Sequence, residues 1–402
     1  MKNLISVKNY SNKNLETYKK ALEIYKEKSE EIKFLYKKID DHNIEVLEKL
    51  SQKIRSQSDV FIIIGVGGSN GASRAVIEGL SSSDIKIEYA GNSLSPKHIR
   101  KILDIVREKD VSINIIAKNF KTLEPGIHFR MIREEMAKKY TKKELEDRII
   151  VTGTKDTLLE KIAIDNNYKF LEFDKEIGGR FSAFTNVHLL PIAVAGIDIR
   201  RYLKARDEFL NSKENIEKIL EYASYRYDSF QKGKVVEILS STDPYLSYFN
   251  KWWVQLFGES QGKDNLGIYP DSMVFSEDLH SMGQFIQSGN PIFMETFLRI
   301  KEYEDVKVYN SNIHDEFEYL DEKAFSNINK AMEEASIKAH LERNIPIFDI
   351  QIDSLSIESF AALFSFFIVA VIISSYLMGV NPFGQEGVEK YKNAMNKNLR
   401  SN

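Results

Sequence analysis

The chain contains no cysteine, which excludes disulfide bonds, thiolate nucleophiles and cysteine-ligated metals. Only seven histidines occur in 402 residues. They are scattered without the spacing of metal ligands, so we expect neither a metal nor another cofactor. Positive charge is not in excess either, because 56 Lys and Arg stand against 59 Asp and Glu, a net charge of -3. Such a chain offers no basic surface for nucleic acid, and an anionic ligand would have to be held by local groups.

The N-terminus lacks the pattern of a secretory signal. Its first six residues, MKNLIS, turn polar before an apolar core could form. We therefore expect a cytoplasmic protein. Hydrophobic residues make up 43% of the chain and charged residues 29%, the balance of a folded, soluble protein. The length predicts two domains rather than one.

One long apolar segment is present near the C-terminus. Residues 360–380 contain no charged side chain over 21 positions, which is long enough to cross a bilayer. The alternative is a helix buried on all sides within a large core. Serines interrupt the segment at 365, 374 and 375, and neither a second span nor a basic flank accompanies it. We favour the buried helix and expect no membrane association.

Short apolar runs alternate with helix-like segments in the first half of the chain. Residues 1–56 have helical periodicity, with Leu15, Tyr18, Leu22 and Tyr25 on one face. Strand-like runs follow at 60–64, 85–90, 113–117, 149–152 and 170–173, and helix-like segments at 73–80, 96–108, 128–140 and 157–166. Strands that alternate with helices predict a parallel sheet with helices on both faces.

A second series of the same kind begins near residue 234. Strand-like runs occur at 235–239, 292–298 and 347–352, an aromatic-rich helix at 245–258 and a last helix at 386–399. The charged stretch between the two series is predicted to be a helical linker. We therefore predict an N-terminal helical segment (1–56), a first α/β domain (57–200), a linker (201–232) and a second α/β domain that ends in a C-terminal helix (233–402).

Two glycine-containing motifs occur in the first domain. The segment 65–71 (GVGGSNG) stands between a strand and a helix, where glycines admit a ligand to the backbone and a helix N-terminus attracts an anion. It is neither a P-loop nor GxGxxG, and a simple tight turn is an equal explanation. The segment 178–182 (GGRFS) presents Arg180, whose guanidinium suits an oxyanion. The alternative there is a surface arginine on a turn.

Three motifs in the second domain carry ionisable side chains. Glu259 lies in FGESQGK (257–263), His280 in DLHSMGQ (278–284), and NPFGQEGVE (381–389) leads to Lys392. A carboxylate near aromatic side chains suits a general base. Taken singly, each has an ordinary explanation: a helix-end glutamate, a structural histidine and a solvated lysine.

The order and spacing of these motifs are more specific than any one of them. Together they resemble the glucose-6-phosphate isomerase family, of the shorter bacterial type, from about residue 61 to 397. The resemblance implies two flavodoxin-like sugar-isomerase (SIS) sandwich domains with parallel sheets, and a homodimer. It also implies interconversion of glucose 6-phosphate and fructose 6-phosphate through a cis-enediol(ate), in glycolysis and gluconeogenesis, without a cofactor.

The family pattern implies a role for each matching residue. Glu259 would carry the proton between C2 and C1, and Arg180 would stabilise the charge of the intermediate. His280, contributed by the partner subunit, and Lys392 would open the sugar ring. Glu124 would orient the catalytic histidine. Substrate contacts would come from Gly68, Ser69, Lys118, Asn119, Thr122, Gly179 and Gln385.

The sequence departs from the family at its phosphate-binding loop. Where the family carries Ser-Lys-(Ser/Thr)-x-Thr-Thr, residues 117–122 read AKNFKT, so three of the four hydroxyl positions are lost and Lys121 adds a cation. Each hydrogen bond to a dianion contributes roughly 1.5–3 kcal/mol, so uncompensated losses would weaken phosphate binding. Gly384 replaces the aspartate that usually precedes Gln385, and His188 replaces a glycine.

These departures leave two alternatives open. One is an isomerase of the same chemistry that acts on a different sugar phosphate. The other is a sugar-phosphate-binding protein with lost or altered specificity. The retention of Glu259, Arg180, His280 and Lys392 argues for turnover, because a protein that only binds has no use for a base.

Overall fold

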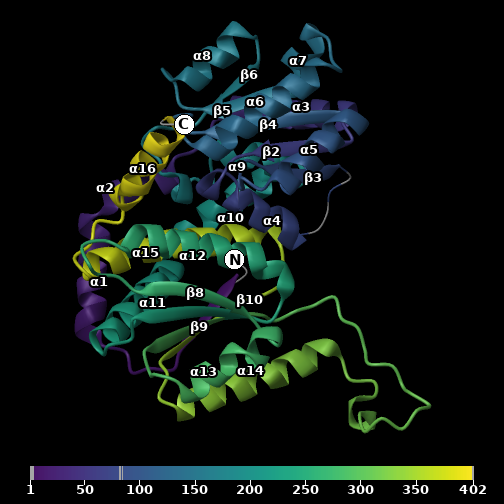
Figure 1. The fold of residues 1–402 in the computed structure, drawn as a ribbon. Helices are drawn as coiled ribbons and strands as arrows, with labels where there is room; N and C mark the ends of the chain where they lie inside the picture. Colours follow the sequence, from purple (N-terminus) through teal and green to yellow (C-terminus); the bar gives the residue numbers. More distant parts are fainter. Residues whose placement is uncertain (1–3, 81–82, 84, 401–402) are drawn as a thin grey trace. The chain divides into compact units, whose positions relative to one another are not determined.

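A computed structural model describes residues 4–80, 83 and 85–400. Within them the chain forms two compact units. Unit A comprises Glu30–Glu208 and Lys251–Leu256, and unit B comprises the described residues up to Ser29, Phe209–Asn250 and the described chain from Phe257 onward. Figure 1 shows the course of the chain through both units. The domain limits at residues 56, 200 and 232 stay a prediction.

Unit A is built on a five-stranded parallel sheet of order β3-β2-β4-β5-β6. In order along the chain this is 2-1-3-4-5, the flavodoxin-like arrangement. The strand β4 is buried at every position, so both faces of the sheet are covered, and this explains the continuous apolar runs. The strands are β2 (Val60–Ile64), β3 (Lys86–Ala90), β4 (Val111–Ala117), β5 (Ile149–Gly153) and β6 (Lys169–Glu172).

The helices of unit A pack on this sheet and on one another. The helices α5 (Pro96–Glu108), α6 (Leu123–Ala137) and α8 (Leu158–Asp165) share one apolar core with the strands. The helix α9 (Asn186–Val194) packs against both α3 (Asp41–Gln57) and α4 (Gly71–Leu80). The remaining elements are α7 (Lys142–Arg148) and the 3-10 turns η1 (Lys33–Tyr36), η2 (Gly67–Ser69) and η3 (Gly179–Phe181). Two further helices, α2 (Ser29–Ile32) and α10 (Ile199–Leu210), lie mostly in unit A and cross its limits at Ser29 and after Glu208.

Unit B contains a second five-stranded sheet, of order β1-β10-β9-β7-β8. Its four parallel strands are β7 (Val236–Ser241), β8 (Tyr269–Val274), β9 (Phe293–Ile300) and β10 (Ile347–Ile352). They repeat the 2-1-3-4 order of unit A, so the predicted pair of flavodoxin-like α/β sandwiches is confirmed. The fifth position belongs to β1 (Ile5–Asn9), which runs antiparallel to β10.

The strand β1 corrects the prediction that residues 1–56 are helical throughout. Its five residues pair with a strand at the far end of the chain, Ile5 opposite Ile352. Local periodicity carries no signal for such a distant partner. Helical structure begins only at α1 (Leu15–Glu27), where Asn14 accepts hydrogen bonds from the N–H groups of Glu16 and Thr17 as an N-cap.

Helices cover the two faces of the sheet in unit B. Figure 1 shows α13 (Met282–Ser288) and α14 (Phe325–Glu342) on one side, with α11 (Lys213–Gln231) and α15 (Ile357–Leu377) on the other. The helix α1 packs against α11 and α15. The remaining elements are α12 (Ser247–Gln261), whose residues 251–256 belong to unit A, η4 (Pro244–Leu246), η5 (Glu277–His280), η6 (Glu318–Leu320), η7 (Glu386–Val388) and α16 (Glu389–Arg400).

The helix α15 is the long apolar segment of the sequence. Among the described residues it is the one helix long and apolar enough to cross a membrane, and 89% of that stretch is buried within the protein. Aromatic side chains of α11 and α12 surround it, with the rings of Tyr222 and Phe249 5.6 and 5.9 Å from that of Phe367. The prediction of a buried helix is confirmed.

A largely irregular connection, residues 301–324, joins β9 to α14 and extends away from the sheet of unit B (Figure 1). We call it the arm. It exposes large apolar side chains, with Tyr309 86%, Ile313 74% and Tyr319 65% accessible. Exposed apolar side chains gathered on one segment are typical of an interaction surface.

Candidate active site

The strand order of unit A reverses between β2 and β4, and both strands end at the same edge. The glycine turn, residues 65–71, follows β2, and the segment 118–122 follows β4. In parallel α/β sheets, ligands bind in the crevice at this edge, where the strand order reverses. Five of the predicted substrate contacts lie on these two segments: Gly68, Ser69, Lys118, Asn119 and Thr122.

The glycine turn lies directly against the GGRFS motif. A Cβ atom on Gly68 would stand 2.3 Å from the carbonyl carbon of Gly179, so no side chain fits there. Two motifs more than 100 positions apart in sequence thus share a backbone contact, and a glycine is required for it. Ser69 is half-buried at the end of η2.

Arg180 is held on the short turn η3. Its side chain is only 4% exposed, and its guanidinium carbon lies 4.7 Å from the centre of the Phe181 ring. The hydroxyl of Ser182 donates to the carbonyl of Gly179 at 2.6 Å. A buried arginine on a braced turn is a preorganised donor for negative charge.

The half-buried Lys118 leads from β4 toward the GGRFS motif. Its ammonium donates to the carbonyl oxygen of Ile177, one residue before that motif, at 3.2 Å. Burial lowers the pKa of Lys118 below its ordinary value, and the nearby carboxylates of Glu176 and Asp174 oppose this effect. The predicted substrate contacts Lys118 and Gly179 therefore lie on connected segments.

The rest of this loop has a shape set by its own residues. Asn119 accepts a hydrogen bond from the backbone N–H of Lys121 at 3.2 Å through its side-chain oxygen. Phe120 takes a left-handed conformation with φ 50°, and its ring packs against Phe129 of α6. The side chains of Asn119 and Lys121 are exposed, whereas Thr122 is half-buried as the residue before α6.

Glu124 lies in the first turn of α6 and is half-buried. One turn further, the buried His128 accepts a hydrogen bond from the backbone N–H of Gly91 at 2.9 Å through Nδ1. Burial, aided by His98, lowers the pKa of His128. This histidine is structural, and the pairing of Glu124 with His280 stays a prediction.

Glu259 occupies the last turn of α12 in unit B and is half-buried. Two residues on, the fully buried Gln261 donates to the hydroxyl of Ser374 on α15 at 2.8 Å. It also accepts a hydrogen bond from Arg226 of α11 at 2.9 Å. The helix end that carries Glu259 is therefore fastened to two neighbouring helices.

The segment of Gln385 is fastened to the same region of unit B. The ammonium of Lys263 donates to the carbonyl oxygens of Asn381 and Phe383, at 2.8 and 2.5 Å. Gly384 has φ 78°, a left-handed conformation that favours glycine and explains why this residue is acceptable there. The structure thus connects the Glu259 motif to the segment that bears Gln385.

The other two predicted catalytic residues lie on separate elements of unit B. His280 ends η5 and is exposed. The carboxylate of Asp278 accepts a hydrogen bond from the backbone N–H of Val274 at 2.7 Å and braces this turn. Lys392 lies in α16 and is half-buried.

His188 is a polar residue of unit A to which the sequence assigned no role. It is 1% exposed, and its ring contacts both Ser73 and Gly68. Its only signal in the sequence was its replacement of the glycine usual in the family, and the fold was needed to reveal its partners.

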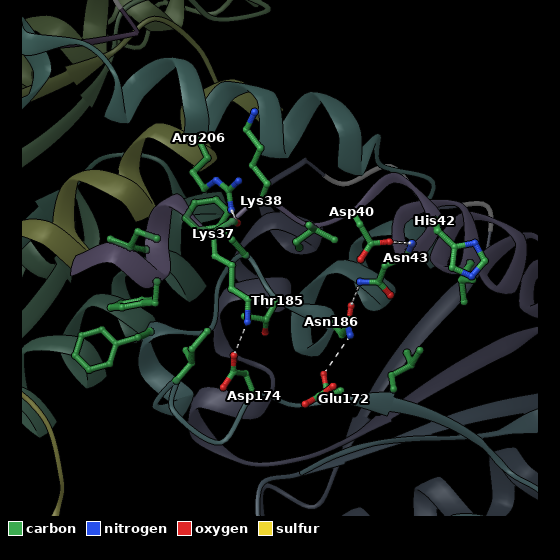
Figure 2. Close-up of a pocket in the computed structure, with 18 of the residues that line it drawn as sticks. Lys37, Lys38, Asp40, His42, Asn43, Glu172, Asp174, Thr185, Asn186 and Arg206 are labelled. Carbon is green, nitrogen blue, oxygen red and sulfur yellow. Dashed lines mark hydrogen bonds and ion pairs between the residues drawn. The ribbon is translucent and has the colours of Figure 1, made fainter. Parts of the chain in front are cut away.

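Unit A also contains a cavity of about 470 Å³, shown in Figure 2. It includes none of the predicted site residues, although it is lined by Phe181 of the GGRFS motif and by Ile177, which directly precedes that motif. Several of its polar groups bind one another: Lys37 pairs with Asp174, and Asn43 donates to Asn186. These pairings reduce its capacity to hold a charged ligand. In the described part of the chain, no group of three or more His, Asp or Glu could hold a metal ion.

The sequence profile described as phosphoglucose isomerase matches residues 27–402. The chain belongs to the phosphoglucose isomerase family. The glucose-6-phosphate isomerase of Caldanaerobacter subterraneus subsp. tengcongensis is 40% identical to it over 374 residues, which cover 89% of this chain and 83% of the relative. That of Shouchella clausii is 39% identical over 368 residues, 87% of this chain and 81% of the relative.

The fold of this family member is also that of a solved isomerase. The crystal structure of a glucose-6-phosphate isomerase from Chlamydia trachomatis matches with a TM-score of 0.74 over 95% of this chain and 77% of that one. At 17% identity, this likeness concerns the fold alone. It agrees with the pair of α/β units described above.

Proposed function

We propose that this protein interconverts glucose 6-phosphate and fructose 6-phosphate through a cis-enediol(ate) intermediate, a step of glycolysis and gluconeogenesis in the cytoplasm. The observation that carries the proposal is the family match over residues 27–402 in a chain that retains Glu259, Arg180, His280 and Lys392. Proton transfer between adjacent carbons requires a base, and an unreactive binding protein would not need this set.

The chemistry assigns one task to each residue. His280 and Lys392 move protons between the ring oxygen and the C1 hydroxyl, which opens the sugar ring. Glu259 takes the proton from C2 and returns it to C1, so the carbonyl passes from C1 to C2. Negative charge develops on the enediolate oxygen, and the guanidinium of Arg180 stabilises it. No redox partner is needed, because the substrate carbons exchange oxidation states.

The phosphate group is assigned to the edge of unit A where β2 and β4 end. Ser69 and Thr122 supply hydroxyl groups, Asn119 an amide, and Lys118 a cation. Gly68 and Gly179 allow the ligand to approach the backbone. A further substrate contact is assigned to Gln385. The support for this assignment is the strand topology, since it places these segments at the usual ligand-binding edge.

A homodimer forms part of the proposal, with His280 entering the active site of the partner subunit. Two observations support it. His280 is exposed on its own chain, and the arm displays Ile313 and Tyr319 to solvent. Apolar side chains on an extended segment are stable when a second copy covers them.

A second candidate function is that of a sugar-phosphate-binding protein with lost or altered turnover. The specific observation in its favour is the loop 117–122, where three hydroxyl positions of the family are replaced. The two candidates differ in whether substrate protons exchange with solvent. A binding protein would hold glucose 6-phosphate without exchanging its C2 proton.

A coupled assay with both sugar phosphates tests the proposal. Purified protein is incubated with fructose 6-phosphate, and glucose 6-phosphate is detected through its dehydrogenase. The reaction is repeated in D₂O, where deuterium at C2 of the product reports the proton transfer. We expect turnover and deuterium incorporation by the native protein and neither by Glu259→Gln. Binding of glucose 6-phosphate by calorimetry without turnover would support the binding protein instead.

A further inference from the structure

His188 of α9 contacts two parts of unit A that are far from it in sequence. Its Nδ1 lies 3.1 Å from the backbone nitrogen of Ser73 and 3.1 Å from the hydroxyl of the same residue. Its Nε2 lies 3.0 Å from the carbonyl oxygen of Gly68. The ring therefore spans from the first turn of α4 to the glycine turn.

These contacts define the protonation state of the ring. The backbone N–H of Ser73 can only donate, so Nδ1 must be the unprotonated, accepting nitrogen. The carbonyl of Gly68 can only accept, so Nε2 must carry the proton. His188 is thus a neutral imidazole with its proton on Nε2. Complete burial is in keeping with this state, since it lowers the pKa of His188 to about 3.

The carbonyl of Gly68 is the point where three segments meet. It accepts from His188, the hydroxyl of Ser182 lies 3.5 Å away, and the α-carbon of Gly68 packs against Gly179. The turn around it is rich in glycine, which is conformationally permissive and needs external contacts to keep one conformation. The hydrogen bond from His188 fixes the orientation of the peptide group between Gly68 and Ser69.

The two hydrogen bonds of His188 have different consequences. The bond to Ser73 satisfies a backbone N–H in the first turn of α4, as an N-cap does, and stabilises that helix. The bond to Gly68 reaches the residues assigned to substrate binding. A purely structural histidine would affect stability through both bonds and leave substrate binding unchanged.

We propose that His188 is a positioning residue of the isomerase reaction, which holds Gly68 and Ser69 in their substrate-binding conformation through its Nε2–H bond to the Gly68 carbonyl. The proposal rests on the function proposed above. It assigns a purpose to the residue at which this chain departs from the glycine of its family. Because the turn contacts substrate in the ground state and the transition state alike, the effect falls on KM more than on kcat.

Two substitutions separate the two hydrogen bonds. In His188→Asn, the side-chain oxygen can take the place of Nδ1 and still accept a hydrogen bond from Ser73. The asparagine side chain is too short to donate to Gly68. The amide of His188→Gln can take the place of Nε2 and still donate to Gly68. We expect His188→Asn to raise KM for fructose 6-phosphate about 3–10-fold, the value of one hydrogen bond, with kcat within about twofold. His188→Gln should keep KM within about twofold.

Hydrogen exchange provides a readout that is independent of activity. His188→Asn should speed exchange in the peptide that covers residues 65–70, whereas His188→Gln should speed it at residues 71–74. Nitrogen NMR of the native protein at pH 7 should show a protonated Nε2 and an unprotonated Nδ1, and this measurement requires no variant.

The outcomes separate the two proposals. Absence of turnover by the native protein would refute the proposed isomerase activity. The hydrogen-exchange pattern of the variants would still decide whether His188 holds the glycine turn. If His188→Asn and His188→Gln are both less stable than the native protein but have equal KM values, the positioning role is overturned and a structural role remains. A neutral ring with its proton on Nδ1 and an unprotonated Nε2 would overturn it as well, since Gly68 would then have no donor in His188.

Discussion

Arg226 donates through Nε to the carboxylate of Glu237 at 2.5 Å, and both side chains are fully buried. The same guanidinium donates through Nη1 to Gln261 and Ser374, each at 2.9 Å. This cluster joins α11, β7, α12 and α15 at the helix end that carries Glu259. A buried charge without its partner is costly, so the cluster should control both the stability of unit B and the placement of Glu259.

We therefore expect Arg226→Met to lower the free energy of unfolding by roughly 3–5 kcal/mol, because Glu237 would remain as an unpaired buried charge. Urea unfolding followed by circular dichroism measures the change. The matched control is Arg200→Met, whose exposed pair with Glu48 should contribute at most about 1 kcal/mol. Removal of both charges in Arg226→Met/Glu237→Leu should restore part of the loss, and no recovery would contradict the explanation.

The second prediction concerns Glu259→Gln. An amide cannot accept the C2 proton, so kcat should fall by roughly 10²–10⁴-fold, while the dissociation constant of glucose 6-phosphate changes little. Steady-state kinetics and calorimetry give the two values. Glu277→Gln, an exposed change of the same kind in η5, serves as the control. Retention of more than about a tenth of the native kcat would show that another group is the base.

The third prediction concerns the altered phosphate loop. Lys121 is exposed beside the loop positions that lack hydroxyl groups, and an ammonium on a flexible stem can reach a phosphate without strict geometry. Lys121→Ala should raise KM about 3–10-fold at low ionic strength, with a weaker salt dependence than the native enzyme and little change in kcat. Lys143→Ala on α7, next to the opposite edge of the sheet, should leave KM unchanged. A KM unaffected by Lys121→Ala would show that the lysine faces only solvent.

The fourth prediction is a pH dependence that arises from His188. Its pKa is about 3 in the folded protein and about 6.5 in an unfolded chain. Between these values the unfolded chain binds the proton and the folded protein does not, so stability falls as the pH falls. Below pH 6 we expect the free energy of unfolding of the native protein to fall by up to about 1.4 kcal/mol per pH unit because of this group.

The comparison with His188→Gln isolates this contribution. The variant lacks the titrating ring, so its stability should decline less steeply between pH 6.5 and 5. The pKa of His128 is also lowered. Because this residue is present in both proteins, its contribution cancels in the difference between their free energies of unfolding. Parallel stability curves for the two proteins would mean that His188 is protonated in the folded state or is accessible to solvent.

The fifth prediction concerns the arm. Substitution of Ile313, Phe317 and Tyr319 by serine removes exposed apolar side chains and should leave the fold of unit B intact. We expect the native protein to elute near twice its 46.4 kDa mass and the variant near the monomer mass. Activity should fall with dimer content if His280 completes the partner's site. A dimeric variant with full activity would place the subunit interface elsewhere.

The sequence predicted those elements whose signals are local. The segment 96–108 was predicted as a helix and forms α5, and 347–352 was predicted as a strand and forms β10. Both have strong periodicity or a continuous apolar run. The strand β8, with the sequence YPDSMV, was not predicted, because it is an edge strand whose proline and aspartate resemble a loop.

The candidate site was predicted only in part. Motif order led to the proposed roles of Gly68, Arg180 and Glu259, yet the contact of Gly68 with Gly179 depends on packing between segments that no local pattern relates. His188 was visible only as an unusual residue, since its meaning depends on two hydrogen-bond partners more than 110 positions away. Tertiary contacts of this kind are determined by the fold as a whole.

The strand β1 has a consequence for the order in which the protein is made. It pairs with β10, which leaves the ribosome after more than 330 further residues, whereas the strands of unit A all lie between residues 60 and 172. During synthesis unit A can complete its sheet early, whereas β1 has no pairing partner for most of translation. Its pairing partner, the β10 edge, is in turn uncovered until β1 joins it. The sheet of unit B is thus completed late, when a strand made at the start of synthesis pairs with one made near its end.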